Sequence, residues 1–243
     1  MVPRETFTPD RFFDLGDVWF SKLFDGLPYP WEILQKDRKE TWIRGNLRAT
    51  VDKIERNGNI VTRTVSIKVS GGEAVVQAGA YIVGDEIELR SGVEIEAGAW
   101  VKGPTILGEG TIVRHGAYIR GGVITGRRAI IGHASEVKSS ILLNEAKAPH
   151  FAYVGDAILG NGVNLGAGTK VSNLKITNDE IIVRLPEKEI RTSLRKFGAI
   201  VGDETETGCN SVLNPGVLLG KKCLVYPGTV VRKNYYSEGS FIR

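Results

Sequence analysis

The chain has 243 residues, of which 42% are hydrophobic and 25% are charged, as in an ordinary soluble globular protein with one or two domains. Its formal net charge of +4 is spread along the chain, which argues against a nucleic-acid-binding surface and suits small phosphorylated or carboxylated ligands. The 30 glycines are too many for an average chain and too scattered for collagen. They indicate a fold that turns corners at regular intervals.

Neither a membrane span nor a metal site is expected. The N-terminus has no basic stretch followed by an apolar run, and no segment is apolar for long enough to cross a bilayer. The two cysteines, Cys209 and Cys223, have no companions at metal-binding spacing and are too few for a tetrahedral site. We interpret both as small buried hydrophobic residues and expect a cytoplasmic protein.

Residues 1–66 differ in character from the rest of the chain. An apolar-rich stretch at 12–24 is followed by Trp31-Glu-Ile-Leu, which predicts the start of a short helix. Residues 48–69 alternate around Asn57-Gly58-Asn59, which predicts a hairpin. We interpret residues 1–66 as a small α+β cap over the open end of the following repeat, whose strand edges would otherwise be unpaired.

A repeat occupies residues 67–243. Gly79-Ala80-Tyr81-Ile82 returns as Gly98-Ala99-Trp100-Val101, nineteen positions later, and again as Gly116-Ala117-Tyr118-Ile119, after a further eighteen. Related tetrads lie six positions earlier, so three six-residue units make one eighteen-residue period. Since each unit supplies one aliphatic residue and one corner, the pattern predicts a triangular parallel β-helix.

The six-residue period excludes two other folds. It does not match the i, i+3, i+4 spacing of an amphipathic helix, in which each glycine would cost about 1 kcal/mol. An antiparallel sandwich would show a period of two with turns every 8–12 residues. The predicted class is therefore all-β, and the period does not by itself set the hand of the coil.

The repeat is interrupted at about 174–197. Two alternating segments, 180–184 and 189–192, flank Leu185-Pro186 and predict a hairpin extruded from the coil. Loops held by a rigid scaffold often carry function.

One stretch carries a more specific signal. It reads His150-Phe-Ala-Tyr153-Val-Gly-Asp156 and continues through Asn164-Leu-Gly-Ala167-Gly-Thr169 to Ser172-Asn173. It resembles the acetyltransferase half of the bifunctional N-acetylglucosamine-1-phosphate uridylyltransferase/glucosamine-1-phosphate acetyltransferases. The archaeal sugar-1-phosphate nucleotidylyltransferase/amino-sugar-1-phosphate acetyltransferases are closer still, given the segments 195–202 and 213–216.

This resemblance covers roughly residues 75–232 and implies a left-handed β-helix. It also implies a homotrimer with active sites between neighbouring coils, and acetyl-CoA as co-substrate. No glycine-rich nucleotidyltransferase signature precedes the coil, so we expect the family's uridylyl-transfer domain to be absent.

The resemblance also implies roles for individual residues. The catalytic base falls on His150. Sugar-contacting positions fall on Tyr153, Asn164 and Asn173, phosphate-binding cations on Arg114 and Lys138, and positions along the coenzyme channel on Ala167, Cys209 and Pro227. The family has small residues at the last two positions, so Cys209 and Pro227 depart from its pattern and favour a non-catalytic protein. A further basic residue of the sugar site has no clear counterpart, and Lys188, Arg195 or Lys196 could replace it.

The chemistry of these residue types agrees with the roles. An amine must be neutral to attack a thioester, and imidazole can take its proton near neutral pH. An arginine fork and a lysine point charge suit a phosphate.

Structural interpretations stand beside these roles. His150 could be a corner residue bonded to a backbone carbonyl, Tyr153 and Asn164 could be stacking and turn residues, and Arg114 and Lys138 could be solvated charges. We interpret His115 and His133 as structural.

We therefore predict an N-acetyltransferase acting on an amino-sugar phosphate or a nucleotide amino sugar, without a metal. Another acyl-CoA could replace acetyl-CoA as the donor. The alternative is a non-catalytic protein that binds a sugar nucleotide or serves as the oligomerisation partner of a nucleotidylyltransferase.

Overall fold

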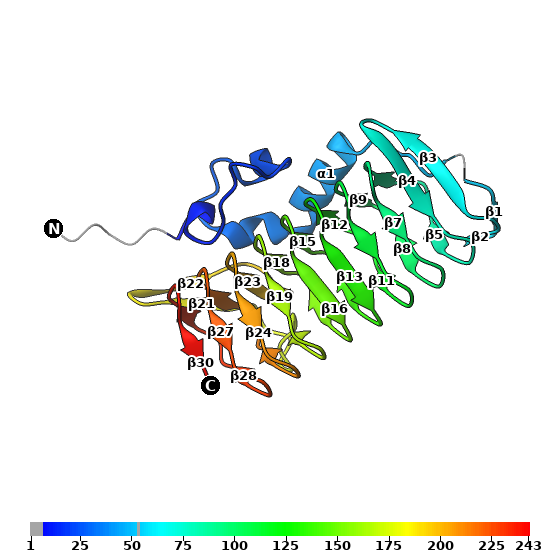
Figure 1. Ribbon diagram of the computed structural model, residues 1–243. Coiled ribbons are helices and arrows are strands. Elements are labelled where there is room, and N and C mark those ends of the chain that lie inside the picture. The colour runs from blue at the N-terminus through cyan, green and yellow to red at the C-terminus, as the bar shows by residue number, and fades with distance from the viewer. Residues whose placement is uncertain (1–6, 53) are drawn as a thin grey trace.

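The computed structural model describes residues 7–52 and 54–243 as a row of stacked coils flanked by an N-terminal segment (Figure 1). Three sheets form the faces of the coils, and we name them A, B and C. Sheet A contains β1 (Arg56–Asn57), β2 (Ile60–Val61), β5 (Tyr81–Val83), β8 (Trp100–Lys102), β11 (Tyr118–Ile119), β14 (Glu136–Lys138), β17 (Tyr153–Gly155), β20 (Lys170–Val171), β25 (Val212–Leu213) and β28 (Val230–Val231).

Sheet B contains β3 (Val65–Val69), β4 (Gly72–Val76), β7 (Glu94–Ile95), β10 (Ile112–Val113), β13 (Ile130–His133), β16 (Lys147–His150), β19 (Asn164–Leu165), β24 (Glu206–Thr207), β27 (Leu224–Val225) and β30 (Phe241–Ile242). Sheet C contains β6 (Ile87–Leu89), β9 (Thr105–Leu107), β12 (Val123–Thr125), β15 (Ile141–Leu142), β18 (Ile158–Leu159), β23 (Ala199–Val201), β26 (Val217–Leu219) and β29 (Tyr235–Tyr236).

The register confirms the predicted parallel β-helix. Ile119 pairs with Val137, one full period further along the chain, whereas Val137 pairs with Val154 after a coil that is one residue shorter. Such shortened coils explain why the six-residue frame drifts in the middle of the sequence. The inward side chains of each sheet stack into one buried aliphatic column, as the period predicts. The left-handed sense of the coil rests on the family resemblance.

A second apolar core lies outside the coil, on the outer face of sheet C. Successive coils place one aliphatic residue each in a column on this face: Ile106, Ile124, Ile141, Ile158, Ile200 and Leu218. These residues are buried against aromatic residues of the N-terminal segment, among them Phe12, Phe13 and Trp31. An uncovered face of this composition would expose a long apolar stripe.

The N-terminal segment therefore lies in a different place from the one we expected. It contains η1 (Pro9–Arg11), η2 (Ser21–Phe24), η3 (Pro30–Leu34) and α1 (Lys36–Asn46), and it runs along the flank of the coil (Figure 1). The short helix expected to start at 31–34 begins there as the 3-10 helix η3, and α1 follows it after Gln35; only Lys39 and Ile43 of this polar helix are buried.

Within the described part of the N-terminal segment, the residues after α1 are those that close the end of the coil. Val51, Ile54 and Val61 belong to the interior core. The expected turn at 57–59 joins β1 to β2, which pair antiparallel, and β3 pairs antiparallel with β4. These hairpins cover the strand edges of the first coil.

Residues 174–197 leave the coil between sheets A and C. They form an antiparallel hairpin of β21 (Ile182–Leu185) and β22 (Lys188–Arg191), closed by a bridge between Leu174 and Lys196. Apolar residues of the hairpin, such as Val183 and Phe197, pack into the core on the flank. Among the described residues, no helix is long and apolar enough to span a membrane.

Candidate functional site

A column of cations follows the edge of sheet A, where each coil turns toward sheet C. The pairing of β8 with β11 and of β11 with β14 places Lys102, Arg120 and Lys138 one above another, because each follows the one before by a full period of the repeat. From the sequence we identified Lys138 alone. The same period, applied backward from Lys138, could have found Arg120.

Lys138 belongs to a hydrogen-bonded network. Its Nζ donates to Oδ2 of Asp156 at 2.7 Å, and Nδ2 of Asn173 donates to the same oxygen. The Tyr153 hydroxyl donates to Oδ1 of Asn173 at 3.3 Å. Burial raises the pKa of Tyr153, with the nearby carboxylate of Glu136 adding to the effect, so this hydroxyl stays protonated. The structure thus brings together Lys138, Tyr153 and Asn173, with Asp156 between them.

A buried lysine of the N-terminal segment lies behind this network. The Nζ of Lys39, on α1, donates to the backbone carbonyl of Ser139, and its side chain is completely buried. Burial lowers the pKa of Lys39 to about 8, against the attraction of the Asp156 carboxylate. Lys39 was not among the predicted site residues, because the repeat period says nothing about a segment outside the repeat.

A cavity of about 520 Å³ opens beside these residues, between α1, the coil and the base of the hairpin. Six cationic residues line it: Lys36, Lys102, Arg120, Lys138, Arg195 and Lys196. Glu40 and Asp156 are the carboxylates of its lining. Two of the three basic residues suggested for the 174–197 loop, Arg195 and Lys196, are therefore in place, whereas the Nζ of Lys188 donates to the Tyr29 hydroxyl at 3.0 Å.

His150 lies at the opposite edge of sheet A, on the corner between sheets B and A. Backbone hydrogen bonds of 2.8–3.0 Å join successive coils at this corner, from Gly168 to His150, from Asn210 to Ala167 and from Gly228 to Cys209. They align His150, Ala167, Cys209 and Pro227 in one column along the coil. The predicted base and the predicted coenzyme positions therefore share one edge.

The three histidines of this corner differ in their contacts. His133 Nδ1 lies 3.0 Å from the backbone carbonyl of His115, and the two rings stack at 4.6 Å. His150 is exposed, and its ring makes no hydrogen bond with any residue that the structure describes. The corner role that we considered for His150 is thus filled by His133.

Arg114 and Asn164 lie on the sheet B side. Arg114 follows β10 and precedes the corner that holds His115, so the structure does not place it beside Lys138. Asn164 is on the outer face of sheet B, in register with Lys147 and Glu206.

One interpretation of the cysteines is wrong. Cys223 is buried, and burial raises the pKa of its thiol, but Cys209 is exposed. The six-residue frame places Cys209 at a corner, where side chains point away from the interior column.

The fold and the site together define a hexapeptide-repeat β-helix with a basic cavity at one edge of a sheet and an exposed histidine at the other. Residues 101–196 match the family described as the GMPPB C-terminal domain.

Over 95 residues, the chain is 39% identical to the bifunctional sugar-1-phosphate nucleotidylyltransferase/acetyltransferase of Sulfurisphaera tokodaii, covering 39% of this chain and 24% of that protein. Over 103 residues it is 34% identical to the bifunctional protein GlmU of Methanococcus aeolicus, covering 42% and 25%. The chain thus spans about a quarter of the length of these curated relatives.

A solved structure of Arabidopsis UDP-N-acetylglucosamine acyltransferase aligns with 69% of this chain and 68% of its own, at 16% identity and a TM-score of 0.37. The resemblance inferred from the sequence is confirmed by the sequence relatives for the middle of the chain. The matched family segment contains Arg120, Lys138, His150, Tyr153 and Asn173, and it excludes the N-terminal segment.

Proposed function

We propose that this protein is an N-acetyltransferase that moves an acetyl group from acetyl-CoA to the amine of an amino-sugar phosphate or a nucleotide amino sugar. One observation carries the proposal. A single coil places His150 at the edge of sheet A where β17 begins, and Tyr153, the first residue of β17, reaches with its hydroxyl toward the other edge, where it joins the network of Lys138 and Asn173. An acceptor lying across sheet A would touch both edges.

The basic cavity is the binding site for the acceptor phosphate. Arg120 and Lys138 supply a guanidinium fork and a point charge in adjacent coils, so Arg120 takes the role that we first assigned to Arg114. The Tyr153 hydroxyl and the Asn173 amide are positioned for sugar hydroxyls. Charge-assisted bonds of this kind contribute about 1.5–3 kcal/mol each.

His150 acts as the general base. It takes a proton from the acceptor amine as the nitrogen attacks the thioester carbonyl, and the coenzyme leaves as its thiol. The coenzyme lies along the column of Ala167, Cys209 and Pro227, at the edge of sheet A that holds His150. Asn164, on the adjacent face, contacts the sugar near this edge. No step in this scheme requires a metal ion.

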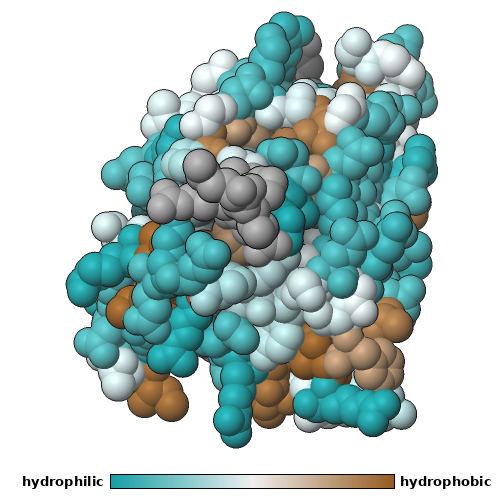
Figure 2. Space-filling view, turned by 90° about the vertical axis from the view of Figure 1, so that its left-hand side faces the viewer, coloured by the Kyte–Doolittle hydropathy of each residue, from teal (hydrophilic) through white to brown (hydrophobic). Residues whose placement is uncertain are grey.

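We further propose that the protein is a cytoplasmic homotrimer with sites between neighbouring coils. The N-terminal segment covers the outer face of sheet C, so sheets A and B are the faces that can contact a neighbouring subunit. Four large apolar side chains near the C-terminal end of these two sheets are 45–59% exposed: Leu224, Tyr226, Val230 and Phe241. Figure 2 shows hydrophobic residues along the lower edge of this end of the molecule.

A thiol-release assay tests the activity directly. The chain is supplied with acetyl-CoA and a panel of amino-sugar phosphates and nucleotide amino sugars. Turnover that depends on His150 supports the proposal. The absence of turnover with every acceptor would favour the alternative, a non-catalytic protein that binds a sugar nucleotide or partners a nucleotidylyltransferase.

A further inference from the structure

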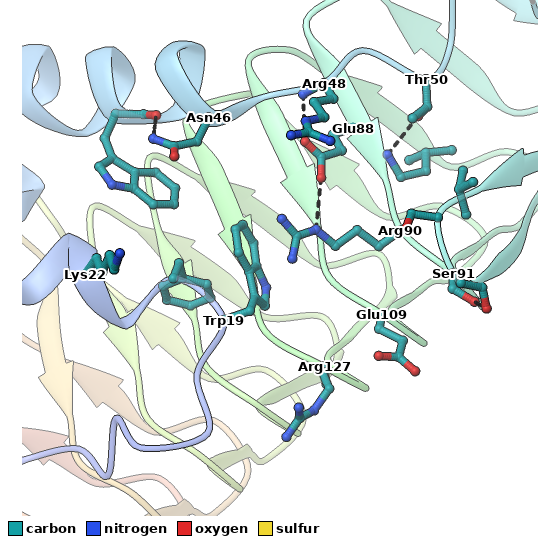
Figure 3. A pocket seen from close by; sticks show the side chains of 16 residues that line it. Trp19, Lys22, Asn46, Arg48, Thr50, Glu88, Arg90, Ser91, Glu109 and Arg127 are labelled. Carbon is teal, nitrogen blue, oxygen red and sulfur yellow. Dashed lines mark hydrogen bonds and ion pairs between the residues drawn. The ribbon is translucent and has the colours of Figure 1, made fainter.

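A second cavity, of about 840 Å³, lies where the N-terminal segment meets the first coils (Figure 3). Its walls come from residues 19–22, from 42–50 at the end of α1, from the hairpin tip at 69–71, and from corners of the coil. It shares no lining residue with the basic cavity. Its volume is in the range of binding sites for small molecules.

The apolar column on sheet C is broken at this cavity. Glu88 pairs with Ile106 and occupies the position that is aliphatic in the next six coils. It is only 7% exposed. Its carboxylate accepts from the Nε of Arg90 at 2.9 Å and from the backbone N–H of Arg48 at 2.7 Å. A buried carboxylate is costly, so its presence where isoleucine would pack indicates that Arg90 must be held in place.

Arg90 is fixed on both sides. Beyond its bond to Glu88, its guanidinium lies over the ring of Trp19, with the central carbon 3.3 Å from the ring centroid. Trp19 is itself anchored, because its Nε1 donates to the carbonyl of Thr125 at 3.0 Å. The two terminal NH₂ groups of Arg90 make no hydrogen bond with any residue in the described ranges. Figure 3 shows this guanidinium in the middle of the cavity.

The remaining lining supplies three further cations, one further carboxylate, that of Glu109, and an aromatic wall. The side chains of Lys22 and Arg48 have no ion-pair partner within the described part of the chain, and Arg127 is paired with Asp17. Trp42 is half-buried, with its ring centroid 6.0 Å from that of Trp19. A preorganised guanidinium fork suits a phosphate, and an indole face suits a flat aromatic ring.

We propose that this cavity binds a nucleoside diphosphate, with its phosphates on Arg90 and Arg48 and its base against Trp42. This site is independent of the acetyl transfer proposed above. It gives the N-terminal segment a function in addition to covering sheet C.

The test is a titration of the full chain with ADP, GDP and UDP, followed by calorimetry and tryptophan fluorescence. It is carried out in the parent protein and in the Lys138→Ala variant, which removes one of the six cations of the basic cavity, and binding should be the same in both. Saturable binding with quenching of fluorescence is expected. Pyrophosphate should bind more weakly than the nucleotides, because it lacks the base, and adenosine more weakly still, because it lacks the charges.

Two variants and one control identify the site. Arg48→Ala, at an exposed position, and Arg90→Lys, which keeps the charge but not the fork, should each weaken binding by about tenfold or more. Arg128→Ala, an exposed residue outside the cavity, should leave it unchanged. Equal binding by all variants, or no nucleotide binding at millimolar concentration, would overturn the proposal. If pyrophosphate bound as tightly as the nucleotides, the base would make no contribution, which would contradict the proposed contact with Trp42.

Discussion

The molecule has two apolar cores that differ in how they are built. The interior column consists of residues that recur with the period of the coil, so every coil supports its neighbours in the same way. The core on the flank joins a periodic column of six aliphatic residues on sheet C to an irregular, aromatic-rich segment that occurs once. The repeat therefore sets where side chains lie, whereas the unique segments decide which faces remain open and where cavities form.

The comparison predicts that the reacting group belongs to the repeat alone. His150→Ala should lower turnover by about 10²–10⁴-fold, since a general base contributes that much. His150→Asn should be damaged nearly as much, because the amide cannot take the proton. Circular dichroism and the melting temperature should stay unchanged for this exposed residue. His115→Ala serves as the control, and equal activity in both variants would refute the assignment.

The N-terminal segment should be necessary for the solubility of the protein rather than for formation of the coil. Removal of residues 1–47 exposes the aliphatic column on sheet C, so the truncated chain should aggregate, as measured by light scattering. Replacement of Ile106, Ile124, Ile141 and Ile158 by threonine in the truncated chain should restore solubility.

A truncated chain that is soluble without these replacements would show that the core between sheet C and the N-terminal segment is dispensable.

Within the full chain, Trp31→Ala should cost about 3–5 kcal/mol of unfolding free energy, as for other fully buried aromatic residues.

Alanine variants of Arg120 and Arg114 test which edge of sheet A binds the acceptor phosphate. Arg120→Ala should raise the acceptor Michaelis constant by about tenfold to a hundredfold, corresponding to about 1.5–3 kcal/mol for a charge-assisted bond. Arg114→Ala should change it by less than about threefold, because the structure places Arg114 away from Lys138. Initial-rate kinetics at saturating acetyl-CoA measure both values. If Arg114→Ala raised the Michaelis constant more than Arg120→Ala does, the phosphate would bind on the sheet B side instead.

Replacement of Lys39 should have the smallest of these effects, a change in unfolding free energy that depends on pH. Its pKa is about 8 in the folded protein and 10.5 in the unfolded chain, so the charged side chain costs roughly 3 kcal/mol below pH 8. Removal of the Lys39 amine also loses its hydrogen bond to Ser139, which costs about 1 kcal/mol of stability and reduces the gain. Lys39→Met should therefore stabilise the protein by about 2 kcal/mol at pH 7.

The sign of the pH dependence follows from proton binding. Between pH 8 and 10.5 the unfolded chain binds more protons at this position than the folded chain does. The parent protein thus gains stability relative to Lys39→Met as the pH rises through this range. Denaturant unfolding of both proteins at pH 7 and pH 10 measures the difference, and a difference independent of pH would contradict the buried charge.

The sequence was sufficient where the repeat acts. The triangular coil and the inward aliphatic column follow from the period, and the positions of Lys138, Tyr153 and Asn173 near one another agree with what the family resemblance implies. The period also contains Arg120, which the structure places beside Lys138, and its role in place of Arg114 stays a proposal. By contrast, Lys39 and the cover over sheet C could not be predicted, because a segment without periodicity does not reveal which face it packs against.

The insertion at 174–197 changes the length of the chain without changing the phase of the coil. Ile158 pairs with Ile200 across the whole insertion as regularly as Ile141 pairs with Ile158 across a single plain coil. Because Arg195 and Lys196 at its base form one wall of the basic cavity, replacing these two residues, while the apolar residues of the hairpin that pack into the second core are kept, should alter acceptor preference under the proposed function. The insertion thus offers a place where the charge of the cavity wall can change without a change in the register of the coil.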